Sequence, residues 1–483
     1  MSALGTRWRP WVDGAPAEST ATATIEVRNP ATGELLGEVP AGTAADADAA
    51  IRSSQTAFRA WRRTPAAERA RLQHAAAALV REHADELGRI LTLELGRPLA
   101  AARTEILRSA DLLGFFAEEG LRLQGEVPLL EEADERVMVV KEPLGVVVAI
   151  APFNFPITLL TFKLGAALIT GNTVVAKPAA DTPLSTLRLA ELFTQAGFPP
   201  GVFNVVTGHG RELGEALVSH PVPAKVGFTG STRAGVRIHQ LAAVTNKRIT
   251  LELGGQCPAI LFDDADLDVA VPAIVKHAYA NSGQFCYRVN RVYVHEDRYG
   301  EFLDRFAAGV RELVVGDGMD PATDLGPLVS ERILATSVEQ VADARAKGAR
   351  VLCGGERLTG EPFDAGPFFA PTVIADATHD MLVMTEETFG PVVGVGSFAD
   401  DTEALAKAND TPYGLAAYVF SDDLRRAWRA AEELEAGSVW VNNIHRSLAQ
   451  VPFGGMKQSG LGREKSKHGL DEYVELKTIY LGM

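Results

Sequence analysis

The chain has 483 residues, of which 46% are hydrophobic and 23% are charged, and its formal net charge is −15. This composition is typical of an ordinary globular protein, and the length suggests roughly three domains. The negative charge disfavours nucleic acid or an anionic membrane as a partner, because both reward clusters of Lys and Arg.

Cysteine occurs only at Cys257, Cys286 and Cys353, and no Cys-x-x-Cys pair is present. We therefore expect neither a disulfide framework nor a metal site, and the scattered histidines form no metal-binding motif. The N-terminus lacks an uninterrupted apolar core. The most apolar run, "PITLLTFKLGAALITG", contains Lys163 and is short for a membrane span. The sequence predicts a cytoplasmic protein that does not enter a membrane.

The elements of the first half alternate in type along the chain. Residues 44 to about 120 are Ala-rich with helical spacing and predict several packed helices. Residues 121–145 contain short alternating stretches such as "RVMVVKEP", which are typical of surface strands. Five apolar, strand-like runs follow, with helical segments between them: 145–152, 173–178, 201–208, 224–230 and 248–255. This alternation predicts a parallel sheet covered on both faces.

A parallel sheet of this kind predicts an α/β fold with a Rossmann-like dinucleotide-binding domain, for which we assign residues 1–122 and 143–252. Ligands of such sheets bind beyond the carboxyl ends of the strands. "FTGSTRAG" lies at one such end, and Gly230 and Gly235 bracket its turn into a helix. Free amides at a helix start suit a diphosphate. The spacing matches neither the dinucleotide fingerprint nor a P-loop, and a plain helix-start turn explains it about as well.

Beyond residue 256 the alternation resumes and predicts a second α/β domain, residues 253–457. This domain carries the stretch "NSGQFCYRVNR", in which Cys286 stands between two aromatic residues. Most unpaired cysteines are small buried hydrophobes. A nucleophilic thiolate is the alternative, and it needs a base and a donor for the oxyanion that it creates. "LELGG" supplies Glu252 and "APFNFP" supplies Asn154, each at the end of a predicted strand.

These stretches resemble the aldehyde dehydrogenase superfamily, as do "FTGST", "EETFGPV", "SVWVNN" and "PFGGMKQSGLGRE", which follow one another in the family's order. The resemblance covers nearly the whole chain. It implies that Cys286 is the catalytic nucleophile, that Glu252 is the general base, and that Asn154 helps the Cys286 amide to hold the oxyanion. Cys257 and Cys353 match no catalytic motif.

The resemblance also implies a nicotinamide cofactor, NAD or NADP. Lys177 in "VVAKP" resembles the adenine-ribose contact, and Gly230 and Ser231 match the diphosphate-binding turn. Glu387 and Phe389 in "EETFGP" match the residues around the nicotinamide ribose and ring.

One departure from the family pattern bears on the choice of cofactor. The family often has Glu at the third position after the lysine, where it binds the ribose hydroxyls, whereas this chain has Ala180. Because a carboxylate there would repel a 2′-phosphate, we expect NADP to be used at least as well as NAD.

The resemblance implies a small-molecule aldehyde as the substrate, and we expect Phe162, Phe285 and Phe453 to line its pocket. Succinate-semialdehyde members often carry Arg where this chain has Phe162, and an aromatic wall suits apolar or aromatic aldehydes. Three basic residues near the active-site motifs could instead meet a distal carboxylate, although surface ion pairing or solvation explains them more simply: Arg288, His445 and Arg446.

The implied reaction begins when the Cys286 thiolate attacks the aldehyde carbon. Loss of hydride gives a thioester, which water activated by Glu252 hydrolyses to a carboxylic acid. A coenzyme A-acylating semialdehyde dehydrogenase and a catalytically silent structural member of the fold are the alternatives. Glu252 weighs against the first, and the intact set of catalytic residues weighs against the second. The resemblance finally implies a homodimer or homotetramer, in which 123–142 and 458–483 form a small β oligomerisation element.

Overall fold

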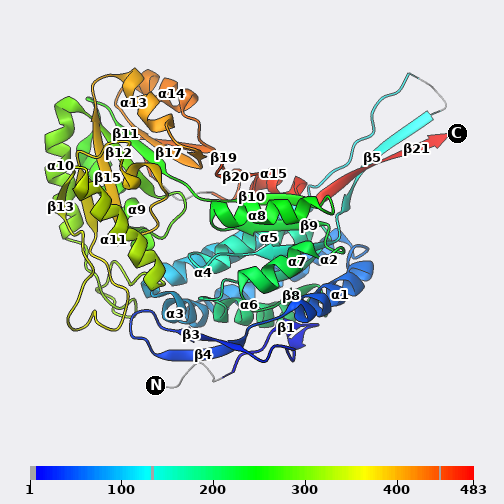
Figure 1. The fold of residues 1–483 in the computed structure, drawn as a ribbon. Helices are drawn as coiled ribbons and strands as arrows, with labels where there is room; N and C mark the ends of the chain where they lie inside the picture. Colours follow the sequence, from blue (N-terminus) through cyan, green and yellow to red (C-terminus); the bar gives the residue numbers. More distant parts are fainter. Residues whose placement is uncertain (1–6, 132–134, 445–447, 483) are drawn as a thin grey trace.

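The computed structural model describes residues 7–131, 135–444 and 448–482 (Figure 1). Within these ranges no helix combines the length and the apolar character that crossing a membrane requires.

The helices are α1 (Ala44–Trp61), α2 (Ala66–Glu82), α3 (Ala84–Leu95), α4 (Leu99–Gly120), α5 (Pro156–Ile169), α6 (Leu184–Gln195), α7 (Glu215–Ser219), α8 (Thr232–Ala243), α9 (Leu267–Ala278), α10 (Glu296–Arg311), α11 (Glu331–Ala346), α12 (Leu382–Thr385), α13 (Asp401–Asn409), α14 (Leu424–Glu433) and α15 (Ser466–Asp471).

The strands are β1 (Trp11–Val12), β2 (Ala15–Pro16), β3 (Thr24–Arg28), β4 (Leu35–Pro40), β5 (Glu135–Pro143), β6 (Val146–Ile150), β7 (Thr173–Lys177), β8 (Phe203–Val205), β9 (Lys225–Thr229), β10 (Arg248–Glu252), β11 (Cys257–Leu261), β12 (Val289–His295), β13 (Arg350–Cys353), β14 (Thr372–Ala375), β15 (Val392–Phe398), β16 (Tyr413–Gly414), β17 (Ala416–Phe420), β18 (Ser438–Val441), β19 (Met456–Lys457), β20 (Gly460–Leu461) and β21 (Val474–Gly482).

The first sheet has eight strands in the order β2-β1-β8-β7-β6-β9-β10-β20. Five neighbouring strands of this sheet are parallel, namely β8, β7, β6, β9 and β10. Each of them falls within one of the five runs predicted from the sequence. The central strands β6, β7 and β9 are buried along their whole length. Helices on both faces bury such strands, which explains their continuous apolar, β-branched sequences.

The second sheet has seven strands in the order β13-β14-β15-β12-β11-β17-β18. All neighbours are parallel except β13, which runs antiparallel at the edge. Figure 1 shows this sheet and its helices as a separate lobe beside the first sheet. The prediction of an α/β fold with two sheet-based units is therefore confirmed.

Helix α5 links the fold to the site because it is buried on nearly every side and packs on α4, β6 and β7. Pro156 at its first position fits a helix start, where the missing N–H removes a donor that has no partner within the helix. An all-round apolar sequence is typical of a helix in a protein interior. Phe162 and Lys163 lie on this helix.

Strands β5 and β21 pair antiparallel. Glu135 lies opposite Gly482 at one end of the pair, and Pro143 lies opposite Val474 at the other. Figure 1 shows this two-stranded arm projecting away from both lobes. The rest of the segment predicted for oligomerisation lies elsewhere, because β20 pairs with β10 in the first sheet and α15 packs on α4 and α5. A ribbon of two strands is marginally stable by itself in water.

Candidate active site

Cys286 and Glu252, the predicted nucleophile and base, come from different lobes, and their loops meet at one turn. Glu252 is the last residue of β10, and Cys286 follows a short 3₁₀ turn before β12. A Cβ atom on Gly255 would lie 2.5 Å from the Cys286 carbonyl oxygen, so the Cys286 loop rests directly on the turn after Glu252. Glycine is required at this close approach.

Asn154 is tied to the same loop. Its Nδ2 donates to the Gln284 carbonyl at 3.1 Å, and Asn281 Nδ2 donates to the Asn154 carbonyl at 3.1 Å. Asn281 and Ser282 both have left-handed backbone conformations, with φ of 53° and 56°. Such strain costs of order 1–3 kcal/mol per residue and collects at functional sites. The fold therefore brings the predicted oxyanion donor to within two residues of Cys286.

Glu252 is 2% exposed, and neither of its carboxylate oxygens has a hydrogen-bond partner among the described residues. Burial and the nearby Glu464 carboxylate raise the pKa of Glu252 well above its usual range, against the effect of Lys163, Arg463 and Lys465. Buried polar groups are nearly always hydrogen-bonded. An unpartnered carboxyl with a raised pKa suits a general base, which works best when its pKa lies near the operating pH.

A buried ion pair that no sequence motif indicated lies beside Glu252. Lys163 Nζ lies 2.7 Å from Glu464 Oε1, and the two side chains are 0% and 1% exposed. The ammonium also donates to Thr229 Oγ1 at 2.6 Å and to the Leu159 carbonyl at 3.3 Å. A charge in an otherwise apolar helix is a signal that a buried partner exists. The sequence could not name that partner.

Cys286 is half-buried, and Cys257 is fully buried behind it, with Sγ 3.8 Å from the Cys286 carbonyl oxygen. Burial raises the pKa of the Cys286 thiol well above its usual value, and Glu252, Cys257 and Glu387 raise it further. The thiol is therefore protonated at neutral pH and must lose its proton before the sulfur can act as a nucleophile. Burial raises the pKa of Cys257 to about 12, as expected for an inert thiol.

The predicted diphosphate turn is hydrogen-bonded to the strand end that carries Glu252. The Gly230 amide donates to the Glu252 carbonyl at 3.0 Å, and Ser231 is the N-cap of α8. No acidic residue occurs in the first turn of α8, so its N-terminus suits an anion. Lys177 is 4% exposed and donates to the Pro178 carbonyl, and burial lowers its pKa to about 8. Ala180, three residues further on, is half-buried.

Glu387 contacts the turn after Glu252, and Phe389 contacts Phe153, the residue before Asn154. Glu387 Oε1 accepts from the Gly255 amide at 3.0 Å, and a Cβ atom on Gly254 would lie 2.8 Å from Glu387 Oε2. Burial raises the pKa of Glu387 to about 7. The Phe389 ring lies 5.8 Å from the ring of Phe153, edge to face. A helix start that can bind a diphosphate, a buried lysine and these two residues together fit a nicotinamide dinucleotide.

The predicted aromatic wall extends from Cys286 in both directions along the chain. Phe285 and Tyr287 flank the cysteine, and their ring centroids are 4.1 Å apart. Tyr287 lies 5.1 Å from Phe453, which lies 6.3 Å from Phe162. The three predicted pocket residues therefore belong to one connected set of rings, and Tyr287 is the member that the prediction omitted.

Both interpretations of Arg288 are wrong, because it neither faces a substrate nor lies on the surface. Its side chain is fully buried, and its guanidinium donates to the backbone carbonyls of Thr388, Gly390 and Val392. It therefore holds the segment that carries Glu387. His445 and Arg446 lie outside the described residues.

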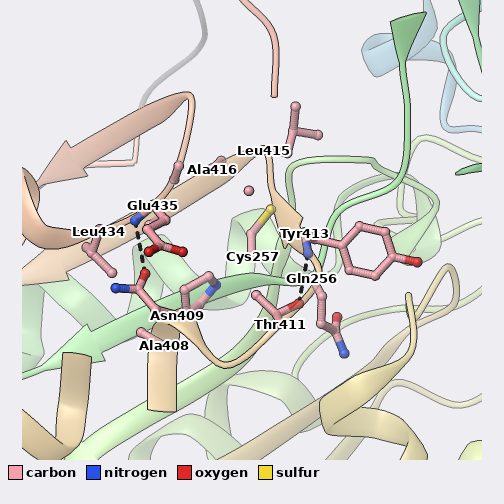
Figure 2. Close-up of a pocket in the computed structure, with 14 residues that line it drawn as sticks. Gln256, Cys257, Ala408, Asn409, Thr411, Tyr413, Leu415, Ala416, Leu434 and Glu435 are labelled. Atoms are coloured by element: carbon pink, nitrogen blue, oxygen red, sulfur yellow. Dashed lines mark hydrogen bonds between the residues drawn. The ribbon is translucent and has the colours of Figure 1, made fainter. Parts of the chain in front are cut away.

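Figure 2 shows a small cavity lined by Gln256, Cys257 and Tyr413, among others, and not by Cys286, Glu252 or Asn154. Its volume of ≈ 10 Å³ has room for about one water molecule and is too small for an aldehyde. Within the described part of the chain, no group of three or more His, Cys, Asp or Glu side chains is placed to hold a metal ion.

Comparison with known proteins identifies the reaction. A model of the aldehyde dehydrogenase family matches residues 17–479. The chain is 44% identical to the succinate-semialdehyde dehydrogenase [NADP(+)] GabD of Escherichia coli (strain K12), over 98% of this chain and 96% of the relative. It is also 44% identical to a glutarate-semialdehyde dehydrogenase of Pseudomonas aeruginosa, over 99% of this chain and 98% of the relative.

A solved structure agrees with these sequence matches. Betaine aldehyde dehydrogenase from Staphylococcus aureus in complex with NAD+ superposes with a TM-score of 0.96 at 37% identity, over 98% of this chain and 94% of that chain. The chain therefore belongs to the aldehyde dehydrogenase family, and it oxidises an aldehyde to a carboxylic acid with NAD or NADP.

Proposed function

We propose that Cys286, Glu252 and Asn154 carry out this oxidation on an aldehyde that has an anionic group at its far end. The observation that carries the assignment is the contact between the Cys286 loop and the turn after Glu252, beside a carboxyl group with no hydrogen-bond partner among the described residues.

In the proposed reaction, the Cys286 thiol loses its proton to water, and the sulfur bonds to the aldehyde carbon. The Cys286 amide and Asn154 Nδ2 donate to the resulting oxyanion, an effect of about 3–4 kcal/mol per donor. A nicotinamide cofactor held by Ser231, Glu387 and Phe389 would supply the acceptor for the hydride that leaves this carbon. Glu252 then takes a proton from water, the hydroxyl oxygen bonds to the thioester carbon, and the Cys286 sulfur leaves.

For the cofactor, we propose that NADP is used at least as well as NAD. Ala180 brings no negative charge to the adenine-ribose end of the site. Asp181 follows it, and burial raises the pKa of that carboxyl group, against the opposing effect of the basic groups Arg332, Lys177 and His209. Three basic groups around one carboxyl group favour a 2′-phosphate.

For the substrate, the two curated relatives described above are named for semialdehydes, whose far end is a carboxylate. Phe162 and Phe453 supply an apolar wall, which is the specific observation in favour of a second candidate, an aromatic aldehyde. We favour the anionic aldehyde because the aromatic wall also holds a cationic side chain, Lys465.

We also propose a homodimer or homotetramer in the cytoplasm. The arm of β5 and β21 leaves Leu476 and Tyr480 63% and 75% exposed, and exposed apolar side chains on a projecting ribbon favour burial against a second copy. Three cysteines that form no disulfide fit a reducing compartment.

The test is a steady-state screen of aldehydes with each cofactor, with Cys286→Ala as the blank. We expect 4-oxobutanoate and 5-oxopentanoate to have kcat/KM values at least about tenfold above those of their neutral methyl esters, because a buried charge-assisted contact contributes that much. NADP should support turnover at least as well as NAD. A preference for benzaldehyde or for the esters would refute the proposed substrate class. Turnover by Cys286→Ala would refute the assigned nucleophile.

A further inference from the structure

Glu105, on α4, is a buried carboxyl group that the proposed reaction does not use. It is 3% exposed, and its Oε1 accepts from the amides of Ile157 at 3.1 Å and Thr158 at 3.0 Å. These amides lie in the first turn of α5, where the N-cap residue, Phe155, makes no side-chain cap. The first amides of a helix have no partner within it, so a carboxylate from another element can complete the helix start. Glu105 therefore fixes the start of α5, two residues after Asn154.

Arg97, in the turn between α3 and α4, extends this contact to Phe155. Its guanidinium is paired with Glu105 Oε2, and both side chains of the pair are buried. The guanidinium also lies over the ring of Phe155, 4.2 Å from the ring centroid. A desolvated cation is attracted to the face of an aromatic ring. The Phe155 ring lies 5.1 Å from that of Phe285, the residue before Cys286. The ion pair therefore holds the chain directly after Asn154 against the nucleophile loop.

The turn between α3 and α4 also contacts the Cys286 loop from the other lobe. Gly326 lies between α10 and α11, so close to the Gly96 carbonyl oxygen that a Cβ atom on it would have no room. The Gly326 carbonyl accepts from Ser282 Oγ at 2.7 Å. Ser282 is one of the two residues with a left-handed backbone in the turn before Cys286. One turn of the first lobe is thus in contact with both halves of the site.

We propose that Glu105 and Arg97 are positioning residues that hold Asn154 where its Nδ2 can reach the oxyanion. The inference rests on the proposed function, in which Asn154 is an oxyanion donor. Glu105 acts through the start of α5, and Arg97 acts through Phe155. A donor lowers the barrier only when it is fixed in advance at the place where charge develops. A misplacement of about 1 Å, caused by a change away from the chemistry, can cost on the order of 10²-fold in rate.

The test is rapid mixing at saturating cofactor with the aldehyde that the screen above ranks first, over a range of aldehyde concentrations. Glu105→Met keeps the length of the side chain and removes the acceptor of both amides. We expect the rate constant for forming reduced cofactor to fall about 10- to 100-fold, because the donor is displaced. The aldehyde concentration at half-saturation should stay within about threefold of wild type.

Glu94→Met is the matched control. Glu94 is also buried, and it accepts from the amides of Leu184 and Ser185 at the start of α6. It therefore completes a helix start in the same way, on a helix that does not carry Asn154. The rate constant in this variant should stay within about threefold of wild type. A loss equal to that of Glu105→Met would overturn the inference.

A double variant separates positioning from general damage. If Glu105 acts through Asn154, then Glu105→Met should cause no further loss beyond about threefold in an Asn154→Ala background, because coupled residues are not additive. Losses that multiply, or an unchanged rate constant in Glu105→Met alone, would overturn the inference. Should Glu105→Met not fold, Arg97→Met/Glu105→Met takes its place with the same expected outcomes, since removing both partners leaves no unpaired buried charge.

Asn154→Ala by itself distinguishes the two levels of the proposal. A loss of less than about tenfold in that variant would refute the oxyanion role of Asn154, and the inference would fail with it. A loss of about 10²-fold or more there, without a loss in Glu105→Met, would refute the positioning role alone.

Discussion

Replacing Glu252 by Gln should separate the two halves of the reaction. The substitution keeps the volume of the side chain and the pairing of β10 with β9 and β20, but it removes the proton acceptor. A general base typically contributes 10²- to 10⁴-fold to a rate. Of the buried carboxyl groups nearby, Glu464 is bound to Lys163 and Glu387 accepts a hydrogen bond from the Gly255 amide, so we expect neither to take its place. We therefore expect a loss in the upper part of that range, about 10³- to 10⁴-fold in hydrolysis, or about 4–5.5 kcal/mol in the barrier.

Rapid mixing of enzyme, cofactor and aldehyde measures both halves in one trace. Glu252→Gln should form about one equivalent of reduced cofactor per site in a fast phase and then turn over slowly, because the thioester accumulates. In the wild type, kcat should rise with pH through the raised pKa of Glu252, since only the ionised form accepts a proton. This dependence should be absent in Glu252→Gln.

Glu387→Gln is the control, because Glu387 bonds to the Gly255 amide and is assigned to the cofactor. It should slow the fast phase instead of the hydrolysis. Steady-state turnover of Glu252→Gln within about tenfold of wild type would refute the role of Glu252 as the base. Loss of the fast phase in that variant would show that Glu252 acts before the thioester forms.

Four further outcomes are expected. Asn154→Ala should slow the fast phase by about 10²- to 10³-fold in rapid mixing, and a loss below about tenfold would contradict its role as an oxyanion donor. Iodoacetamide should modify Cys286 more slowly than free cysteine near neutral pH, because its raised pKa keeps it protonated; peptide mapping checks this, and equal rates would contradict it. Ala180→Glu should lower kcat/KM for NADP relative to NAD by about tenfold or more, since like charges repel, and an unchanged ratio would count against the proposed ribose contact. Leu476→Asp on the arm should shift sedimentation towards the monomer, and a wild-type sedimentation coefficient would rule the arm out as the interface.

The types and order of the elements were predictable because each depends on local sequence. Apolar, β-branched runs separated by helical segments predicted the parallel strands of the first sheet, and β6 to β10 lie within those runs. Glu252 and Cys286 were also identifiable, because short motifs record the tight turns on which they lie. Gly255 illustrates this: no side chain fits between that turn and the Cys286 carbonyl.

The electrostatic surroundings of the site were not predictable in the same way. Arg288 reads as an exposed cation in the sequence, yet it is buried and binds carbonyl groups about a hundred positions away. Lys163 and Glu464 are 301 positions apart and meet only because α5 and the segment before α15 pack together.

The sequence alone determined an α/β protein of the aldehyde dehydrogenase family, and it singled out Cys286 and Glu252 as the candidate nucleophile and base. Only the tertiary structure decided that Lys163 and Glu464 neutralise each other beside Glu252, and that Lys465 reaches the rings of Phe162 and Phe453. The physical reason is that burial and electrostatic potential at a point sum over every nearby segment. The distance of those segments along the chain does not enter this sum, so a local sequence pattern cannot specify the burial or the potential.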